Sequence, residues 1–194
     1  MNKTATTLML LAALLASTSA AADTLLRLRL IRTSPEAGSG PVYEMDVNGS
    51  YSQDLDASWF ITPQLLAELA VGTPQPLDLS LRDTALGRMH QIPLIGMLQY
   101  RYPAWRDVQG YVGVGFNYTV FTDRKLDGDL RLQRSSTGPV LQLGCDVLLH
   151  QAWTVNIDIK KTWIDSDLFD AQGFVTHLNI DPLMAGIGLG YHFR

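Results

Sequence analysis

Cysteine is nearly absent from this sequence: Cys145 is its only one among 194 residues. A single cysteine cannot form a disulfide within the chain, so no disulfide framework holds the fold together. The stability must therefore come from an apolar core or from a membrane.

Long apolar runs and an excess of basic charge are missing too. After the first 22 residues no run of about 18 apolar residues occurs, which excludes a transmembrane helix in that part of the chain. The 15 lysines and arginines stand against 19 aspartates and glutamates, which gives a net charge of -4 at pH 7. This balance argues against nucleic acid as a partner.

The first residues have the pattern of a secretory signal peptide. Lys3 provides a positive start, a short apolar block follows it, and Ala20 and Ala22 form a small-residue A-x-A cleavage site. We therefore expect a cleaved signal peptide over residues 1–22 and one mature domain over residues 23–194. An exported chain with 46% hydrophobic residues is either a soluble periplasmic protein or an outer-membrane barrel, and the alternation of residue types separates the two.

The clearest alternation lies at the C-terminus, in residues 181–193. Every second residue from Leu183 onward is apolar or aromatic, and the other phase is mostly glycine. Because the side chains of a strand alternate between its two faces, this pattern predicts a strand with one face suited to lipid. Tyr191 and Phe193 end the apolar face, as expected of the aromatic girdle of a membrane barrel. If this strand closes a barrel, it must pair with the first strand.

The same alternation recurs in seven earlier segments. Their outward phase is apolar, and their other phase carries charges that must face a polar interior, because arginine facing lipid at mid-bilayer costs about 2–4 kcal/mol. The sequence therefore predicts an all-β fold, an eight-stranded antiparallel up-and-down transmembrane β-barrel. Because the number of strands is even, both ends of the chain are expected on the periplasmic side. The predicted strands are residues 24–32, 50–60, 65–71, 91–102, 111–119, 140–148, 153–163 and 181–193; the short turns are residues 61–64, 103–109 and 150–152; the longer loops are residues 33–41, 73–90, 121–134 and 165–176.

The inward phase holds two kinds of residue. Charged side chains point inward from several strands, and we expect them to pair with one another to offset the cost of burial. Apolar side chains on the same phase either line a path for a hydrophobic solute or fill a barrel whose interior is just wide enough for side chains. The charged set is Arg27, Arg29, Glu68, Asp158 and Lys160, and the apolar set is Leu66, Ile95, Met97 and Met184.

The sequence offers little for catalysis or cofactor binding. His90, His150, His177 and His192 lie far apart and show no metal-ligand spacing, so we expect no metal site and no cofactor. Enzymatic activity is not expected either. A lipid-acting enzyme is the weaker alternative, and it would depend on Ser166 with His177 near one rim of the barrel.

The order of these segments resembles the OmpW family of small outer-membrane proteins. The matching pieces span nearly the whole mature chain, and the two most specific are Y-V-G-x-G-x-N-Y-T and the terminal segment. They are residues 68–74 (E-L-A-V-G-T-P), 91–93 (Q-I-P), 111–119, 181–182 (D-P) and 190–193 (G-Y-H-F). The resemblance implies an eight-stranded barrel with a narrow, largely hydrophobic lumen that admits small hydrophobic molecules and opens laterally toward the bilayer.

The chain departs from the family pattern in two places. Where the family can place a leucine and a tryptophan as a constriction in the lumen, this chain has Ala70 and Lys160. The family usually ends on the aromatic residue itself, whereas here Phe193 is followed by Arg194.

We therefore expect a porin-like channel of the bacterial outer membrane for passive uptake of small hydrophobic molecules. Its expected partners are outer-membrane lipid, lipopolysaccharide and hydrophobic solutes. The alternative is a structural or interaction barrel whose extracellular loops bind partners. The residues predicted to line the substrate path are Leu66, Ala70, Ile95, Met97, Lys160 and Met184.

Overall fold

The computed structural model describes residues 23–34, 37–39, 45–47, 50–81, 84–126, 131–132, 134–170 and 173–193. Side chains are described at residues 23–34, 50–76, 90–122, 134–164 and 181–193. The predicted signal peptide, residues 1–22, lies outside these ranges. The described residues include no helix of sufficient length and apolar character to cross a bilayer.

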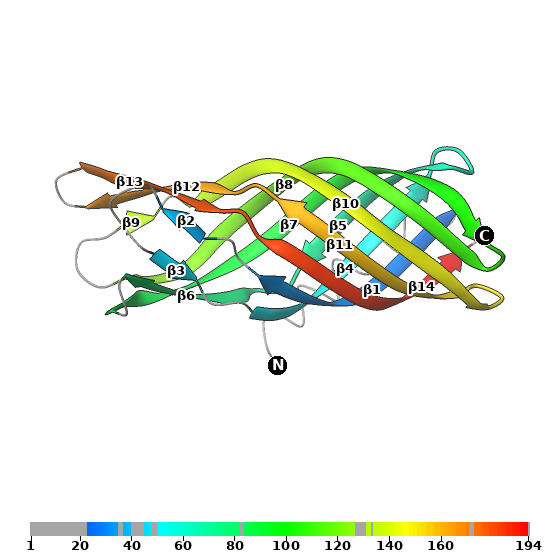
Figure 1. The fold of residues 1–194 in the computed structure, drawn as a ribbon, viewed down its shortest axis with the longest axis horizontal. Coiled ribbons are helices and arrows are strands. Elements are labelled where there is room, and N and C mark those ends of the chain that lie inside the picture. Colours follow the sequence, from blue (N-terminus) through cyan, green and yellow to red (C-terminus); the bar gives the residue numbers. More distant parts are fainter. Residues whose placement is uncertain are drawn as a thin grey trace.

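Eight antiparallel strands of the described chain close into a barrel (Figure 1). The first and last strands lie side by side, as the sequence predicts, with Thr24 opposite Phe193 and Ser34 opposite Leu183. Pairing of β7 with β8 completes the circle. The barrel strands are β1 (Thr24–Ser34), β4 (Ser50–Phe60), β5 (Leu65–Gly72), β7 (Thr84–Trp105), β8 (Val108–Leu126), β10 (Ser135–His150), β11 (Trp153–Thr162) and β14 (Leu183–Phe193).

Shorter strands extend the wall at the end of the barrel that lies away from the C-terminus, which we call the long-hairpin end (Figure 1). β12 and β13 form a hairpin that also pairs with β9 and β2, and β6 pairs with both β3 and β7. These strands are β2 (Ala37–Ser39), β3 (Met45–Val47), β6 (Gln75–Leu81), β9 (Arg131–Leu132), β12 (Asp165–Asp170) and β13 (Gly173–Ile180).

The prediction of loops in these regions is wrong over much of their length. β6 and the start of β7 occupy the predicted loop 73–90, and β12 with β13 occupies the predicted loop 165–176. Backbone pairing needs only a neighbouring strand, whereas the alternation of apolar residues is expected only where one face meets lipid. β12 lacks this alternation, whereas β6 has it at Leu77, Leu79 and Leu81, beside prolines that favour a loop.

Three tight turns join the strands at the opposite end, which we call the short-turn end. In the first, the Leu65 N–H donates to Thr62 Oγ1 at 2.9 Å. The second contains only Arg106 and Asp107, shorter than the predicted 103–109, because β7 and β8 continue toward each other. In the third, Gln151 has a φ of 49°, a left-handed conformation that tight hairpin turns require.

The inner and outer faces follow the predicted phases. Leu28, Ile157 and Ile187 are about half exposed on the outer face, while Arg27 and Lys160 are buried inside. Exposed aromatic side chains gather at the short-turn end, where Tyr191 contacts the rings of both neighbours in an edge-on arrangement: Trp153, Phe193. An apolar outer wall with an aromatic girdle is the surface that a bilayer requires.

Candidate functional site

A network of buried charges fills the middle of the barrel interior. Arg27 donates from Nε and Nη2 to the two carboxylate oxygens of Asp146, at 3.1 and 2.9 Å, and from Nη1 to Asp56 Oδ1 at 3.2 Å. Its Nη1 also lies 3.3 Å from Glu68 Oε2. A bidentate guanidinium–carboxylate pair of this kind fixes both partners in one orientation.

Arg29 connects four carboxylates one row further along β1. Its guanidinium lies 2.8 Å from Asp54, 2.9 Å from Asp56 and 3.3 Å from both Glu68 and Asp158, always measured from nitrogen to oxygen. These carboxylates come from three strands, two from β4 and one each from β5 and β11. Arg29 therefore holds opposite sides of the barrel together.

Lys160 completes the charged set and answers one question raised by the sequence. Its ammonium lies 2.8 Å from Asp158 and 3.7 Å from Asp54. At this position, where the family can have an aromatic constriction, the present chain thus has a cation that is bound within the network. The expectation that the inward charges pair with one another is met by these contacts.

Uncharged polar side chains link the ions. Gln99 donates to Glu68 at 2.5 Å and to Gln142 at 2.7 Å, and Gln142 donates to Asp158 at 2.7 Å. Asn156 donates to both Asp146 and the hydroxyl of Tyr111 at 2.8 Å. We call the whole set the ionic plug: Arg27, Arg29, Asp54, Asp56, Glu68, Gln99, Arg101, Tyr111, Gln142, Asp146, Asn156, Asp158 and Lys160.

Glycines on β14 make room for the ionic plug. A Cβ on Gly188 would lie 2.3 Å from the Leu28 carbonyl oxygen and 2.6 Å from Arg29 Cγ, so any larger residue there would displace β1 together with the arginine. The other strands supply the polar groups, and β14 supplies the space. Because every side chain of the plug is at least nine-tenths buried, no water-filled channel passes between them.

An apolar compartment lies between the ionic plug and the long-hairpin end. Its buried cluster comprises Ala70, Ile95, Met97 and Val140. Ile31 and Met184 are buried on the same inner face, and Thr162 contacts the sulfur of Met184 at 3.9 Å. We call this set of residues the apolar compartment.

The six residues predicted to line the path all lie buried on the inner face, but not in one place. Ala70, Ile95 and Met97 contact one another in the apolar compartment, with Met184 on the same face. Lys160 belongs to the ionic plug. Leu66 lies nearer the short-turn end than Glu68, and is therefore separated from the others by the charges. Val140 and Ile31 were not predicted, although their inward phase is the signal that could have identified them.

The barrel wall beside the apolar compartment has a break in strand pairing. Pairing of β5 with β7 ends at Val71 opposite Leu94, and pairing of β6 with β7 begins at Gln75 opposite Gln91. Pro93 lies in this interval and has no N–H to donate. The Thr73 N–H instead donates to the carbonyl of β4, at Gln53, 2.8 Å away.

Gly72 and Pro93 fit together across this break. A Cβ on Gly72 would lie 2.7 Å from Pro93 Cγ, so the proline ring packs where a larger residue would have its side chain. At this place the wall is held by ring packing in place of a continuous ladder of backbone hydrogen bonds. The inner neighbour two residues along β7 is Ile95, of the apolar compartment.

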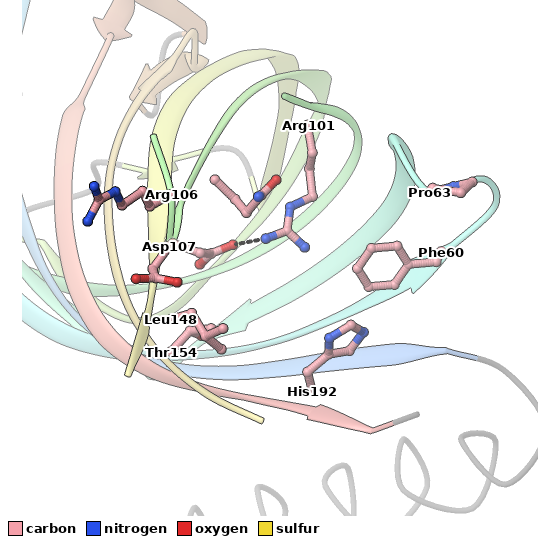
Figure 2. Close-up of a pocket in the computed structure, with 10 residues that line it drawn as sticks. Phe60, Pro63, Arg101, Arg106, Asp107, Leu148, Thr154 and His192 are labelled. Atoms are coloured by element: carbon pink, nitrogen blue, oxygen red, sulfur yellow. Dashed lines mark hydrogen bonds and ion pairs between the residues drawn. The ribbon is translucent and has the colours of Figure 1, made fainter. Parts of the chain in front are cut away.

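A pocket of about 230 Å³ opens at the short-turn end, on the other side of the ionic plug (Figure 2). Sequence reasoning did not predict it. The pocket forms where the side chains of Phe60, Arg101 and His192 meet from β4, β7 and β14. The alternation of residues does not give their heights along the barrel. Its lining residues are Phe60, Pro63, Arg101, Arg106, Asp107, Gln109, Asp146, Leu148, Thr154 and His192.

The structure also bears on the residues of the alternative functions, a lipid-acting site and a metal site. The register of β12 with β13 sets Ser166 opposite Leu178 and His177 opposite Asp167, and their side chains lie outside the described residues. Among the described residues, no group of three or more histidine, cysteine, aspartate or glutamate side chains is arranged to hold a metal ion. Cys145 is half-buried on the outward phase.

A closed antiparallel barrel with an apolar outer wall, an interfacial aromatic girdle and a polar interior defines a transmembrane β-barrel of the outer-membrane type. The model of the OmpW family matches residues 22–193, and the chain belongs to this family. It is therefore a protein of the bacterial outer membrane.

Individual relatives agree with this assignment. Outer membrane protein W of Escherichia coli is 27% identical over 178 residues, covering 84% of each chain. Dibenzothiophene metabolism operon protein PahQ of Pseudomonas aeruginosa is 27% identical over 161 residues, covering 76% of this chain and 74% of that protein. The crystal structure of OprG from Pseudomonas aeruginosa has the same fold, with a TM-score of 0.79 and 23% identity over 90% of this chain and 97% of that one.

Proposed function

We propose that this protein lets small hydrophobic molecules cross the outer membrane passively, entering from the long-hairpin end and leaving sideways into the bilayer. The observation that carries the proposal is the division of the interior, in which the apolar compartment ends on the ionic plug. The short turns and the two ends of the chain would face the periplasm, and the long hairpins would face the outside of the cell, as in other outer-membrane barrels. No covalent chemistry and no cofactor take part.

The ionic plug argues against passage along the barrel axis. A solute on that route would have to separate Arg29 from its carboxylates, and breaking a buried ion pair costs about 3–5 kcal/mol. An apolar solute offers the separated charges nothing in return. The solute therefore has a favourable environment only above the plug.

The break in the wall supports a lateral exit. Opening the wall elsewhere would cost a run of backbone hydrogen bonds, at about 1 kcal/mol each. Around Pro93 the pairing of β7 with β5 and β6 is already interrupted. Displacing the proline ring from Gly72 would connect the apolar compartment to lipid at the smallest cost in hydrogen bonds.

The name of one relative supports an aromatic, water-insoluble solute. PahQ is named for an operon of dibenzothiophene metabolism, and dibenzothiophene is an apolar heteroaromatic compound. We propose the same class of solute here: compact apolar molecules that fit between Ala70, Ile95 and Met184.

Uptake into liposomes that contain the purified protein tests the proposal. A hydrophobic fluorescent probe should enter faster than it enters empty liposomes, and Ala70→Trp should remove most of the difference because the indole fills the apolar compartment. Ala67→Trp is the matched control, since Ala67 lies on the same strand but on the outward phase. Equal rates in loaded and empty liposomes, or equal inhibition by the two substitutions, would contradict the proposal.

A further inference from the structure

Two residues that line the pocket at the short-turn end each have a buried polar atom that lacks a partner among the described residues. These atoms are Arg101 Nε and Thr154 Oγ1. Both residues are more than nine-tenths buried, and both line the same pocket. A buried donor without an acceptor is unfavourable by about 1–3 kcal/mol, so two of them beside one pocket indicate a place for an acceptor.

Arg101 has donors to spare because its carboxylate partner is already occupied. Asp146 accepts two hydrogen bonds from Arg27 and one from Asn156, in addition to the one from Arg101 Nη2 at 3.0 Å. A carboxylate accepts about four hydrogen bonds, so Asp146 is saturated. The remaining donors of the Arg101 guanidinium can serve another acceptor.

An aromatic plate lies beside these donors. The ring of Phe60 stacks on the imidazole of His192 with centroids 4.9 Å apart, and the guanidinium carbon of Arg101 lies 5.5 Å from the Phe60 centroid. His192 is itself paired with Asp23 at 2.5 Å. Figure 2 shows Arg101, Phe60 and His192 directed toward the same space from β7, β4 and β14.

The lining of the pocket thus combines hydrogen-bond donors with an apolar surface. Leu148 and Pro63 extend the apolar part, and at the turn Arg106 and Asp107 carry opposite charges. The volume of about 230 Å³ is smaller than the roughly 300–1,000 Å³ of pockets for drug-sized ligands. The pocket therefore suits a molecule of about one ring.

We propose that this pocket binds a small aromatic acid from the periplasmic side, with its carboxylate on Arg101 and Thr154 and its ring against Phe60. Charge-assisted hydrogen bonds to a guanidinium are about twice as strong as neutral ones, which favours a carboxylate over a neutral acceptor. The site is separate from the apolar compartment, because the ionic plug lies between them. The proposal goes beyond the proposed uptake function and does not depend on it.

Calorimetric titration of the whole protein in detergent micelles tests this site, with benzoate as the probe. Benzamide has the same ring without the charge, and inorganic phosphate has the charge without the ring. Benzoate should bind saturably, and benzamide and phosphate should each bind at least about tenfold more weakly. This comparison separates recognition of the whole acid from partition into micelles and from binding of any oxyanion.

Two substitutions should weaken benzoate binding. Arg101→Lys keeps a positive charge for Asp146 but removes the planar fork, and it should raise the Kd about tenfold. Thr154→Val removes one donor at constant shape and should raise the Kd about fivefold. Arg32→Lys is the matched control, because Arg32 is exposed near the other end of β1 and should leave the Kd unchanged.

Folding of each variant is checked by thermal unfolding, and Thr154→Val keeps the test valid if Arg101→Lys does not fold. Failure to saturate with benzoate overturns the proposal, as does equal affinity for benzamide or an unchanged Kd in Thr154→Val. Liposome uptake is measured on the same preparations. Loss of uptake with intact benzoate binding would contradict only the uptake function, and the reverse result would contradict only this site.

Discussion

The two halves of the barrel interior use the same inward phase of the same strands in opposite ways. Toward the short-turn end, five carboxylates and four cations form ion pairs across the barrel. Toward the long-hairpin end, Ala70, Ile95, Met97 and Val140 contact one another without a charge among them. Strand geometry is common to both, so the difference is set by residue type alone.

This difference separates two properties that a membrane barrel needs. The ionic plug depends on directional contacts that tie several strands together, so it rigidifies the wall and closes the axis. The apolar compartment depends on non-directional contacts, which tolerate the loss or gain of a neighbour far better. We therefore expect the plug to dominate stability and the compartment to dominate function, and the following substitutions test that division.

Removing the cation at the centre of the ionic plug should have the largest effect. Arg29→Met keeps the length of the side chain but leaves Asp54, Glu68 and Asp158 without one of their partners. We expect the free energy of unfolding to fall by about 3–5 kcal/mol, the cost of breaking a buried ion pair from one side. Urea unfolding in lipid vesicles measures it.

The control for this prediction is Arg32→Met, three residues further along the same strand. Arg32 is exposed, and its guanidinium carbon lies 5.9 Å from the centroid of the Tyr51 ring. Exposed cation–π contacts contribute about 0.5–1 kcal/mol, so its loss should be several times smaller. If the two variants lost similar stability, the ionic plug would not be the source of rigidity.

Deletion of a single carbon from a side chain in each half should have an effect of intermediate size on the free energy of unfolding, and a larger effect in the ionic plug than in the apolar compartment. Glu68→Asp withdraws the carboxylate from Arg27, Arg29 and Gln99, and hydrogen bonds to charged groups are worth about 1.5–3 kcal/mol. Ile95→Val removes one methyl group from the apolar compartment and should cost only about 0.5–1.5 kcal/mol. The same unfolding measurement should therefore rank Glu68→Asp as the more damaging.

Solute uptake should rank these two variants the other way. Ile95→Val enlarges the apolar compartment and should leave probe uptake unchanged or raise it, whereas Glu68→Asp should leave it unchanged because the proposed route does not pass Glu68. Uptake that fell with Glu68→Asp in a well-folded sample would show that solute does pass the ionic plug, and the lateral exit would be wrong.

The division of the interior could be predicted from the sequence only as a list of inward residues. Alternation identifies Arg27 as inward because Leu28 must face lipid, and the same rule places Asp146 inside on β10. It does not predict that they meet, since they are 119 positions apart and their heights depend on the register of every strand between them. Leu66 shows the consequence, because it shares the inward phase with Ala70 yet lies on the other side of the charges.

The extensions of the wall were harder to predict for a different reason. β12 shows no alternation of apolar residues, whereas in β6 Leu77, Leu79 and Leu81 do alternate with Asp78 and Ser80, and the prolines beside them favoured a loop. The pocket beside Phe60 and His192 could not be predicted either, because it depends on the contact of β4 with β14, which are far apart in the sequence. Contacts that follow from a membrane boundary can be read from one strand, whereas contacts that follow from closure of the barrel cannot.

Deletion of a hydroxyl group gives the finest comparison of the two halves. Tyr111→Phe removes the acceptor for Asn156 inside the ionic plug and should lower the free energy of unfolding by about 1 kcal/mol. Thr162→Val removes a hydroxyl whose contact in the apolar compartment is the sulfur of Met184, a weak acceptor, and should change it by no more than about 0.5 kcal/mol. The ring of Tyr111 keeps its contact with Arg27 in the phenylalanine variant, so the difference between the two substitutions measures the hydrogen bond alone. A loss for Thr162→Val that equalled the loss for Tyr111→Phe would mean that hydrogen bonding matters as much beside Met184 as beside Asp146, and the boundary between plug and compartment would then have no energetic meaning.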